Sequence, residues 1–307
     1  MPGKRGPFGR AIKAIKNTLI YWSVRIAMAV FSILPLAFLR MKFGFLGYIV
    51  ARLPIKLNRI AKENLEAVFP EKSPAERKKI LLDCYSGLGR CAAEVVKVGL
   101  TDMKPSAVCR FSPGTRELFD SAIAAGTGAI FITGHIGNWE IMASYTAEQG
   151  YPVYTIAKES YDPRFTGLIK RFRESKGVHC LWKGDPDIKE KIIGVFLSGA
   201  LLGVLLDQDT KVPGVFADFF GRKAFTASLP AVIAVKAGLP VFSAFTHRDD
   251  DGMNVVTVKK LDLSVPEGVD PVVYITTVFN RAIEENIRKY PHEWVWMHER
   301  WKTRPKA

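Results

Sequence analysis

The sequence predicts an α/β fold in which helices flank a mixed, partly parallel central sheet, preceded by a hydrophobic helix near the N-terminus. From Gly128 onward, short runs rich in β-branched and aromatic residues alternate with longer stretches of helical composition, which is typical of strand–helix–strand units. The first run, 129–133, is wholly apolar, as in strands buried on both faces. The tetrapeptide DDDG at 249–252 predicts a hairpin turn, so we expect an antiparallel sheet edge there.

The expected strands cover 128–134, 152–157, 178–182, 201–206, 239–245 and 254–260. The expected helices lie near 114–124, 138–149, 163–176, 186–198, 226–237 and 271–289. Residues 56–100 are also of helical composition, with an interruption near 69–73. There the segment Ser73-Pro74-Ala75-Glu76 forms a capping box with proline at the first helical position, which predicts a helix start.

The 307 residues allow one large or two modest domains, and the sequence contains no obvious linker or internal repeat. We therefore expect a basic N-terminal segment over 1–16, a hydrophobic membrane-anchor region over 17–55 and a single α/β domain over 56–307.

The apolar stretch from Ile26 to Leu39 has 14 residues, fewer than the roughly 20 that a membrane-spanning helix needs. Extending it back to Leu19 includes Arg25, which is costly in the middle of a bilayer. Pro35 predicts a kink. Three interpretations stay open: a single spanning anchor, a helix lying in the plane of the membrane surface, or a buried core helix.

The formal net charge of +14 favours acidic partners, such as anionic lipids, phosphorylated substrates or an acidic carrier protein. No recognisable nucleic-acid-binding module accompanies this charge, so we expect no nucleic-acid partner. The four cysteines form no CxxC pair, and Cys84 and Cys91 are spaced to share one helix face as small core residues. This pattern indicates a reducing compartment. We expect no metal site, because no segment has ligand spacing of the HExxH type.

The most informative stretch is GAIFITGHIGNWE, residues 128–140. His135 and Glu140 follow the expected buried strand at its carboxyl end, the usual place for ligand sites in open α/β sheets. On one continuous helix their side chains would diverge by roughly 140°, but a bend at Gly137–Asn138 would let them meet. A carboxylate bonded to the imidazole would leave the other ring nitrogen free to act as a general base.

His-x4-Glu in this setting resembles the His-x4-Asp/Glu motif of the glycerolipid and lipid A acyltransferases. The similarity is greatest to the late lipid A acyltransferases, the lauroyl and myristoyl transferases of Gram-negative bacteria, and extends over roughly residues 17–305. The segments that carry it beyond the motif are NRIAKENLEAVFP (58–70), RESKG (173–177), LDQDT (206–210), DFFGR (218–222) and PHEWVWMHERWKTRP (291–305).

The resemblance implies a glycerolipid-acyltransferase-like fold and a catalytic group of His135, Glu140, Arg173 and Asp207. His135 would be the general base and Glu140 would orient its ring. Arg173 would clamp a phosphate or stabilise the oxyanion, although Arg171 is a near neighbour that could fill this place. The site carboxylate of the LDQDT block is Asp207 or, alternatively, Asp209, and it would hold Arg173 or position His135.

The residues we expect to contact substrate are Asn138, Asp209, Arg222, Thr226 and Ser228. Asn138 would otherwise cap the helix that follows it, and Thr226 and Ser228 are expected at a helix N-terminus that can cradle phosphate. Two aromatic groups have open alternatives. Phe219 and Phe220 would line an acyl groove or pack in the core, and Trp294, Trp296 and Trp301 would lie at the membrane interface or cover the core.

The expected function is transfer of a fatty acyl chain from acyl carrier protein to a hydroxyl of a phosphorylated lipid A precursor. The resemblance implies catalysis at the cytoplasmic face of the inner membrane, without a cofactor. The alternatives are a related acyltransferase that uses another glycolipid or a lysophospholipid with acyl-CoA, and a non-catalytic membrane protein that binds anionic lipid.

Overall fold

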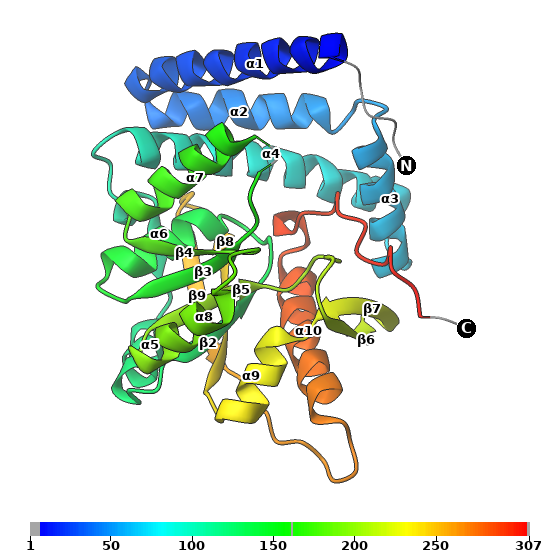
Figure 1. Ribbon diagram of the computed structural model, residues 1–307. Coiled ribbons are helices and arrows are strands. Elements are labelled where there is room, and N and C mark those ends of the chain that lie inside the picture. Colours follow the sequence, from blue (N-terminus) through cyan, green and yellow to red (C-terminus); the bar gives the residue numbers. More distant parts are fainter. Residues whose placement is uncertain (1–6, 161, 306–307) are drawn as a thin grey trace.

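The computed structural model describes residues 7–160 and 162–305 and is shown in Figure 1. Residues 1–6 of the expected basic segment lie outside the described residues. Three long helices are stacked above the central sheet in Figure 1: α1 (Pro7–Ile33), α2 (Leu36–Val50) and α4 (Pro74–Leu100). The helix α3 (Lys56–Val68) links α2 to α4 at one end of this stack.

The central sheet has seven strands in the order β1-β9-β8-β2-β5-β3-β4. All neighbouring pairs are parallel except β8–β9, so the mixed and mostly parallel sheet expected from the sequence is confirmed. The strands are β1 (Cys109–Phe111), β2 (Ala129–Thr133), β3 (Val153–Ala157), β4 (Val178–Trp182), β5 (Leu201–Leu205), β8 (Val241–Arg248) and β9 (Asn254–Lys260).

Three details differ from the sequence-based expectation. The antiparallel β8–β9 pair is not at the edge, because the short strand β1 adds parallel to β9. A separate hairpin, β6 (Gly214–Phe219) and β7 (Arg222–Ala227), was not expected. Its second strand occupies the start of the helix predicted over 226–237, so α9 begins only at Leu229.

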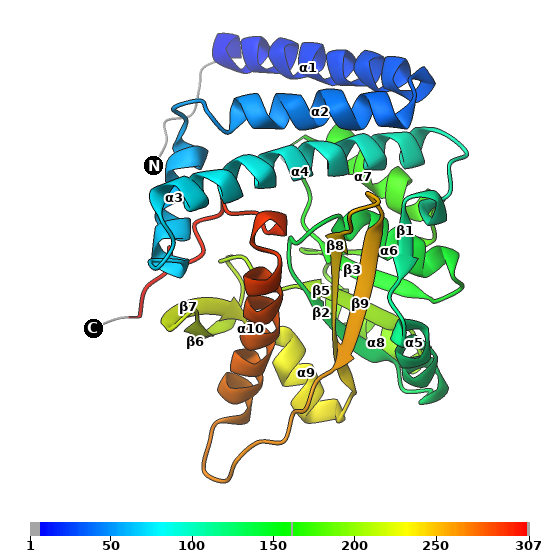
Figure 2. The same cartoon turned by 180° about the vertical axis from the view of Figure 1, so that it is seen from behind.

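Helices cover both faces of the sheet (Figures 1 and 2). One face carries α5 (Thr115–Ala124) and α6 (Trp139–Glu148), and α7 (Pro163–Ser175) packs beside β4. The other face carries α8 (Ile188–Leu197), α9 (Leu229–Ala237) and α10 (Pro271–Lys289). Because side chains alternate along a strand, Phe131 of β2 joins the core beneath α6, whereas Ile130 and Ile132 join the opposite core.

The helix α4 begins where the sequence predicts. Ser73 accepts a hydrogen bond from the backbone N–H of Glu76, and the Glu76 carboxylate accepts one from the backbone N–H of Ser73. Cys84 and Cys91 are both buried core residues on this helix, as expected.

The N-terminal region consists of two helices rather than one kinked helix, because Pro35 separates α1 from α2. Within residues 7–160 and 162–305, no helix combines the length and the apolar character needed to cross a membrane.

The chain ends in an irregular segment that follows the 3₁₀ helix at Pro291–Glu293 and passes beneath α4 (Figure 2). Its three tryptophans, Trp294, Trp296 and Trp301, are at most 8% exposed. Their expected place at a membrane interface is therefore wrong, and the alternative, a segment that covers the core, is confirmed.

Candidate active site

The loop that follows β2 carries His135 at the carboxyl edge of the sheet. Gly134 lets Asp207 approach closely, because a Cβ at this position would lie 3.2 Å from Cγ of Asp207, a tight contact. Gly137 has φ of +59°, and a Cβ on it would come within 2.3 Å of the Thr246 carbonyl oxygen. The bend predicted at Gly137–Asn138 is thus confirmed, and α6 starts directly after it.

The carboxylate bonded to His135 belongs to Asp207, which follows the neighbouring strand β5. Nδ1 of His135 lies 2.8 Å from Oδ1 of Asp207, and the backbone N–H of His135 donates to Oδ2 at 2.8 Å. The Asp207 side chain is 1% exposed and that of His135 is 25% exposed. The expectation that Glu140 orients the ring is therefore wrong, because Asp207 occupies Nδ1.

The two groups shift each other's pKa. Burial lowers the pKa of His135, but the charge and hydrogen bond of Asp207 outweigh burial and leave it above its ordinary value. Burial raises the pKa of Asp207, yet the charge and hydrogen bond of His135 lower it to about 2. Asp207 is therefore ionised at neutral pH and can stabilise a protonated His135.

Glu140 forms an ion pair with Arg173 of α7 instead. Nε of Arg173 donates to Oε2 of Glu140 at 2.9 Å, and Nη2 donates to Oε1. Burial lowers the pKa of Arg173, but the Glu140 hydrogen bonds outweigh it and raise the pKa overall. Glu140 still lies near enough for its charge to raise the pKa of His135. Arg171 is exposed on the other side of α7, so Arg173 is the arginine at the site.

The C-terminal segment holds the histidine loop in place. Ile136 and Trp294 form an isolated antiparallel bridge, in which the N–H of Val295 donates to the carbonyl of His135 at 3.1 Å. The indole Nε1 of Trp294 also donates to Oδ2 of Asp207 at 2.9 Å. Sequence reasoning missed this contact, because it singled out the tryptophan only as a membrane or core residue.

Two of the expected substrate contacts are occupied by the protein itself. Asn138 is 2% exposed, caps α6 through the N–H of Ile141 and donates to Glu94. It therefore caps a helix, as its alternative interpretation predicts. The Asp209 carboxylate accepts hydrogen bonds from the backbone and hydroxyl of Thr303, so Asp207, rather than Asp209, is the carboxylate of the site.

The remaining expected contacts lie on or near the β6–β7 hairpin. Thr226 is fully buried within β7, where its hydroxyl oxygen accepts a hydrogen bond from Arg300. It does not lie at a helix N-terminus, and a role in binding phosphate is wrong. Ser228 is the N-cap residue of α9 but makes no side-chain cap. Arg222 is exposed, and its guanidinium lies 4.7 Å from the Trp301 ring centroid.

Phe219 and Phe220 do not line an acyl groove. Both are buried in the core on the α9–α10 face of the sheet. The pocket beside Glu140 and Arg173 lies on the opposite face, so the core interpretation of the two phenylalanines is the correct one.

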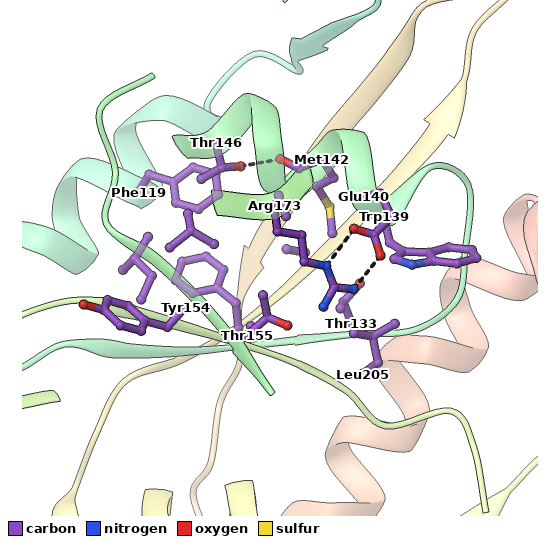
Figure 3. Close-up of a pocket in the computed structure, with 16 residues that line it drawn as sticks. Phe119, Thr133, Trp139, Glu140, Met142, Thr146, Tyr154, Thr155, Arg173 and Leu205 are labelled. Atoms are coloured by element: carbon purple, nitrogen blue, oxygen red, sulfur yellow. Dashed lines mark hydrogen bonds and ion pairs between the residues drawn. The ribbon is translucent and has the colours of Figure 1, made fainter. Parts of the chain in front are cut away.

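This pocket lies between α6 and the sheet (Figure 3). Its lining is mostly apolar and includes Phe119, Phe131, Trp139, Met142, Ala143, Val153, Leu201, Gly203, Leu205 and Ala244. Figure 3 shows the Glu140–Arg173 pair at one end and Phe119 with Tyr154 toward the other. The Trp139 ring packs edge-on against His135 with centroids 4.9 Å apart, which places the histidine beside the polar end.

The arrangement combines three features that matter for its chemistry. A histidine is held by a buried carboxylate through Nδ1, which leaves Nε2 to accept a proton. An arginine fixed by Glu140 supplies positive charge next to it, where it can stabilise a developing negative charge. An apolar pocket opens beside both and suits a hydrocarbon chain. Together they fit acyl transfer to a hydroxyl group.

Comparison with known proteins gives the same indication. A family model described as bacterial lipid A biosynthesis acyltransferase matches residues 8–303. A phosphatidylinositol mannoside acyltransferase from Mycolicibacterium smegmatis is 28% identical over 59% of the chain. The match covers 59% of that relative, less than two thirds of its length. The lipid A biosynthesis palmitoleoyltransferase of Escherichia coli is 23% identical over 80% of the chain and 79% of its own length. A Shigella flexneri protein named lipid A biosynthesis acyltransferase 2 is 23% identical over 92% of the chain and 90% of its own length.

Proposed function

The chain belongs to the bacterial lipid A biosynthesis acyltransferase family, and from this premise we propose that it transfers a fatty acyl chain to a hydroxyl of a lipid A precursor. The family expected from the sequence motifs is confirmed, and its relatives are acyltransferases. The observation that carries the proposal is the His135–Asp207 pair beside an apolar pocket, with Arg173 at the pocket's polar end.

In the proposed reaction, Nε2 of His135 takes the proton of the acceptor hydroxyl as its oxygen attacks the thioester carbonyl carbon. The new C–O bond gives a tetrahedral oxyanion, and the breaking C–S bond then releases a thiolate. The proton on His135 passes to that sulfur. Asp207 stabilises the transient imidazolium, since it is ionised and bonded to Nδ1.

Arg173 has the proposed role of stabilising the oxyanion. Its guanidinium is held in place by the two hydrogen bonds that it donates to the Glu140 carboxylate, so it needs little reorganisation when negative charge develops. The Arg173 side chain is 14% exposed and that of Glu140 is 21% exposed, so the pair is partly shielded from water. This shielding strengthens the attraction between the guanidinium and a developing oxyanion.

We propose acyl carrier protein as the donor and a phosphorylated glycolipid as the acceptor. The net charge of +14 supports both, because carrier protein and phosphorylated lipid are acidic. A second candidate acceptor is a mannosylated phosphoinositide. The similarity to mycobacterial phosphatidylinositol mannoside acyltransferases favours it, and acyl-CoA would then be an alternative donor.

We further propose that α1 and α2 bind the cytoplasmic face of the inner membrane. Both helices expose large apolar side chains to solvent, including Leu19 (64%), Ile33 (80%) and Phe45 (61%). Cations such as Lys42 and Arg52 lie on the same helical pair or just after it and suit anionic headgroups. The free cysteines agree with a reducing compartment.

The test is an acyl-transfer assay with purified protein in which acyl carrier protein and CoA thioesters are each combined with a lipid A precursor or a mannosylated phosphoinositide. Mass spectrometry identifies the product. His135→Ala should reduce transfer by a factor of about 10²–10⁴ and leave binding to anionic vesicles unchanged. If the wild type binds vesicles but transfers acyl groups to neither acceptor, the protein is a non-catalytic lipid-binding member of the family.

A further inference from the structure

Gly203 lies in the middle of β5, a strand at the centre of the sheet. Glycine weakens the interior of a strand, since it supplies no side chain to pack, and at such a position it often marks the close approach of a ligand. Its backbone is of the ordinary extended kind, so no turn or positive φ explains the glycine.

The register places Gly203 on the floor of the apolar pocket. It pairs with Phe131 of β2 on one side and with Thr155 of β3 on the other, and all three residues line the pocket. A Cβ added to Gly203 would meet only the Tyr154 carbonyl oxygen, at 3.6 Å. A Cβ therefore fits at this position in ordinary van der Waals contact, on the face of the strand that lines the pocket.

The strand register also gives the pocket a length scale. Leu205 lies beside the Glu140–Arg173 pair (Figure 3). Two residues back along β5 comes Gly203, and two further back comes Leu201, in the last row of the strand register that lines the pocket. Four residues of strand span roughly 13 Å. An extended alkyl chain advances roughly 1.3 Å per carbon, since each C–C bond is about 1.5 Å. The distance between the outer rows thus matches the length of roughly ten carbons.

Phe119 of α5 closes the far end. It is 3% exposed and stacks on Phe131 and Tyr151 with ring centroids 4.9 Å away in each case. A longer acyl chain would have to displace the Phe119 ring, and the neighbouring rings that stack on it resist that displacement.

We propose that Gly203 determines the length of the acyl chain that this protein accepts, by leaving the pocket open as far as the Phe119 wall. The proposal rests on the proposed acyl transfer. Filling the middle row should divide the pocket in two and exclude the outer part of the chain. Removing the Phe119 ring should lengthen the pocket and admit a longer chain.

The experiment offers the wild type and three variants an equimolar mixture of saturated acyl donors from 8 to 18 carbons, and mass spectrometry reads the chains transferred. Gly203→Leu should shorten the preferred chain by roughly five carbons, the length of two strand residues. Phe119→Ala should move it toward longer chains. Gly194→Leu is the matched control, because Gly194 is exposed on α8 outside the pocket and has open space around its Cβ.

A second measurement separates this proposal from the function itself. Displacement of a fluorescent fatty acid by unlabelled acids of each length reports chain preference even when no transfer occurs. Circular dichroism melting verifies that each variant is folded, and Gly203→Ala replaces Gly203→Leu if that variant is not. An unchanged chain preference in a folded Gly203 variant, by either measurement, overturns the proposal. Loss of transfer in the wild type with a normal displacement series overturns only the proposed reaction.

Discussion

The indole Nε1 of Trp294 donates a hydrogen bond of 2.9 Å to Oδ2 of Asp207. Both side chains are 1% exposed, so water does not compete for this bond. The same carboxylate accepts from the backbone and the ring of His135. A residue 87 positions beyond Asp207 in the sequence thus fixes the carboxylate that in turn fixes the histidine.

Removing this indole donor should change the titration of His135. In Trp294→Phe the Asp207 charge loses one hydrogen bond and becomes a stronger acceptor for the imidazolium, so the pKa of His135 should rise. The acid limb of the kcat/KM profile then moves to higher pH. Trp296→Phe is the matched control, because Trp296 is equally buried but donates to the Pro291 carbonyl, away from the pair. Identical profiles for the two variants would contradict a role for the Trp294 bond.

Asp207→Asn and Glu140→Gln should differ in their pH dependence. The wild type loses activity as pH falls through the pKa of His135, which lies above its usual value mainly because of Asp207. Asp207→Asn should move this acid limb to lower pH and reduce kcat by a factor of about 10²–10⁴. Glu140 does not bond the ring, so Glu140→Gln should move the limb much less. NMR titration of His135 measures its pKa in both variants. A larger pKa shift in Glu140→Gln than in Asp207→Asn would show that Glu140 is the carboxylate that orients the ring.

Membrane binding should depend on the exposed apolar side chains of α1 and α2. The double variant Leu19→Glu, Phe45→Glu should weaken partitioning into anionic vesicles at least about tenfold, since each side chain loses on the order of 1 kcal/mol of apolar burial. Sedimentation with vesicles measures it. Leu197→Glu is the control, because Leu197 is 82% exposed on α8, which lies far from α1 and α2 in both views (Figures 1 and 2). If Leu197→Glu weakened vesicle partitioning equally, the loss would come from the added negative charge rather than from the apolar side chains of α1 and α2.

Gly137→Ala should destabilise the fold by more than about 3 kcal/mol. The φ of +59° is strained for alanine by about 1–2 kcal/mol, and the new Cβ would also come within 2.3 Å of the Thr246 carbonyl oxygen. Gly238→Ala shares the strain, with φ of +61°, but its Cβ would meet nothing within 4 Å. Urea denaturation compares the two. Equal losses would mean that the close contact at Gly137 relaxes at little cost.

The sequence by itself determined the alternation of strands and helices from β2 onward, because short apolar runs rich in β-branched residues and helix-capping signals are local. It also determined the loop that carries His135, since Gly134, Gly137 and Asn138 are local turn and capping residues. The strands β1, β6 and β7 escaped prediction. They are short or form a separate hairpin, and their pairing partners rather than their own composition define them.

Only the tertiary structure decided which charged groups meet. His135 lies five residues from Glu140 but bonds Asp207, because β2 and β5 are neighbours in the sheet and their carboxyl ends open at the same edge. Glu140 pairs with Arg173 for a similar reason, since α6 and α7 flank the same pocket. Spacing along a chain fixes local geometry alone, whereas strand order, a property of the whole fold, selects the partners.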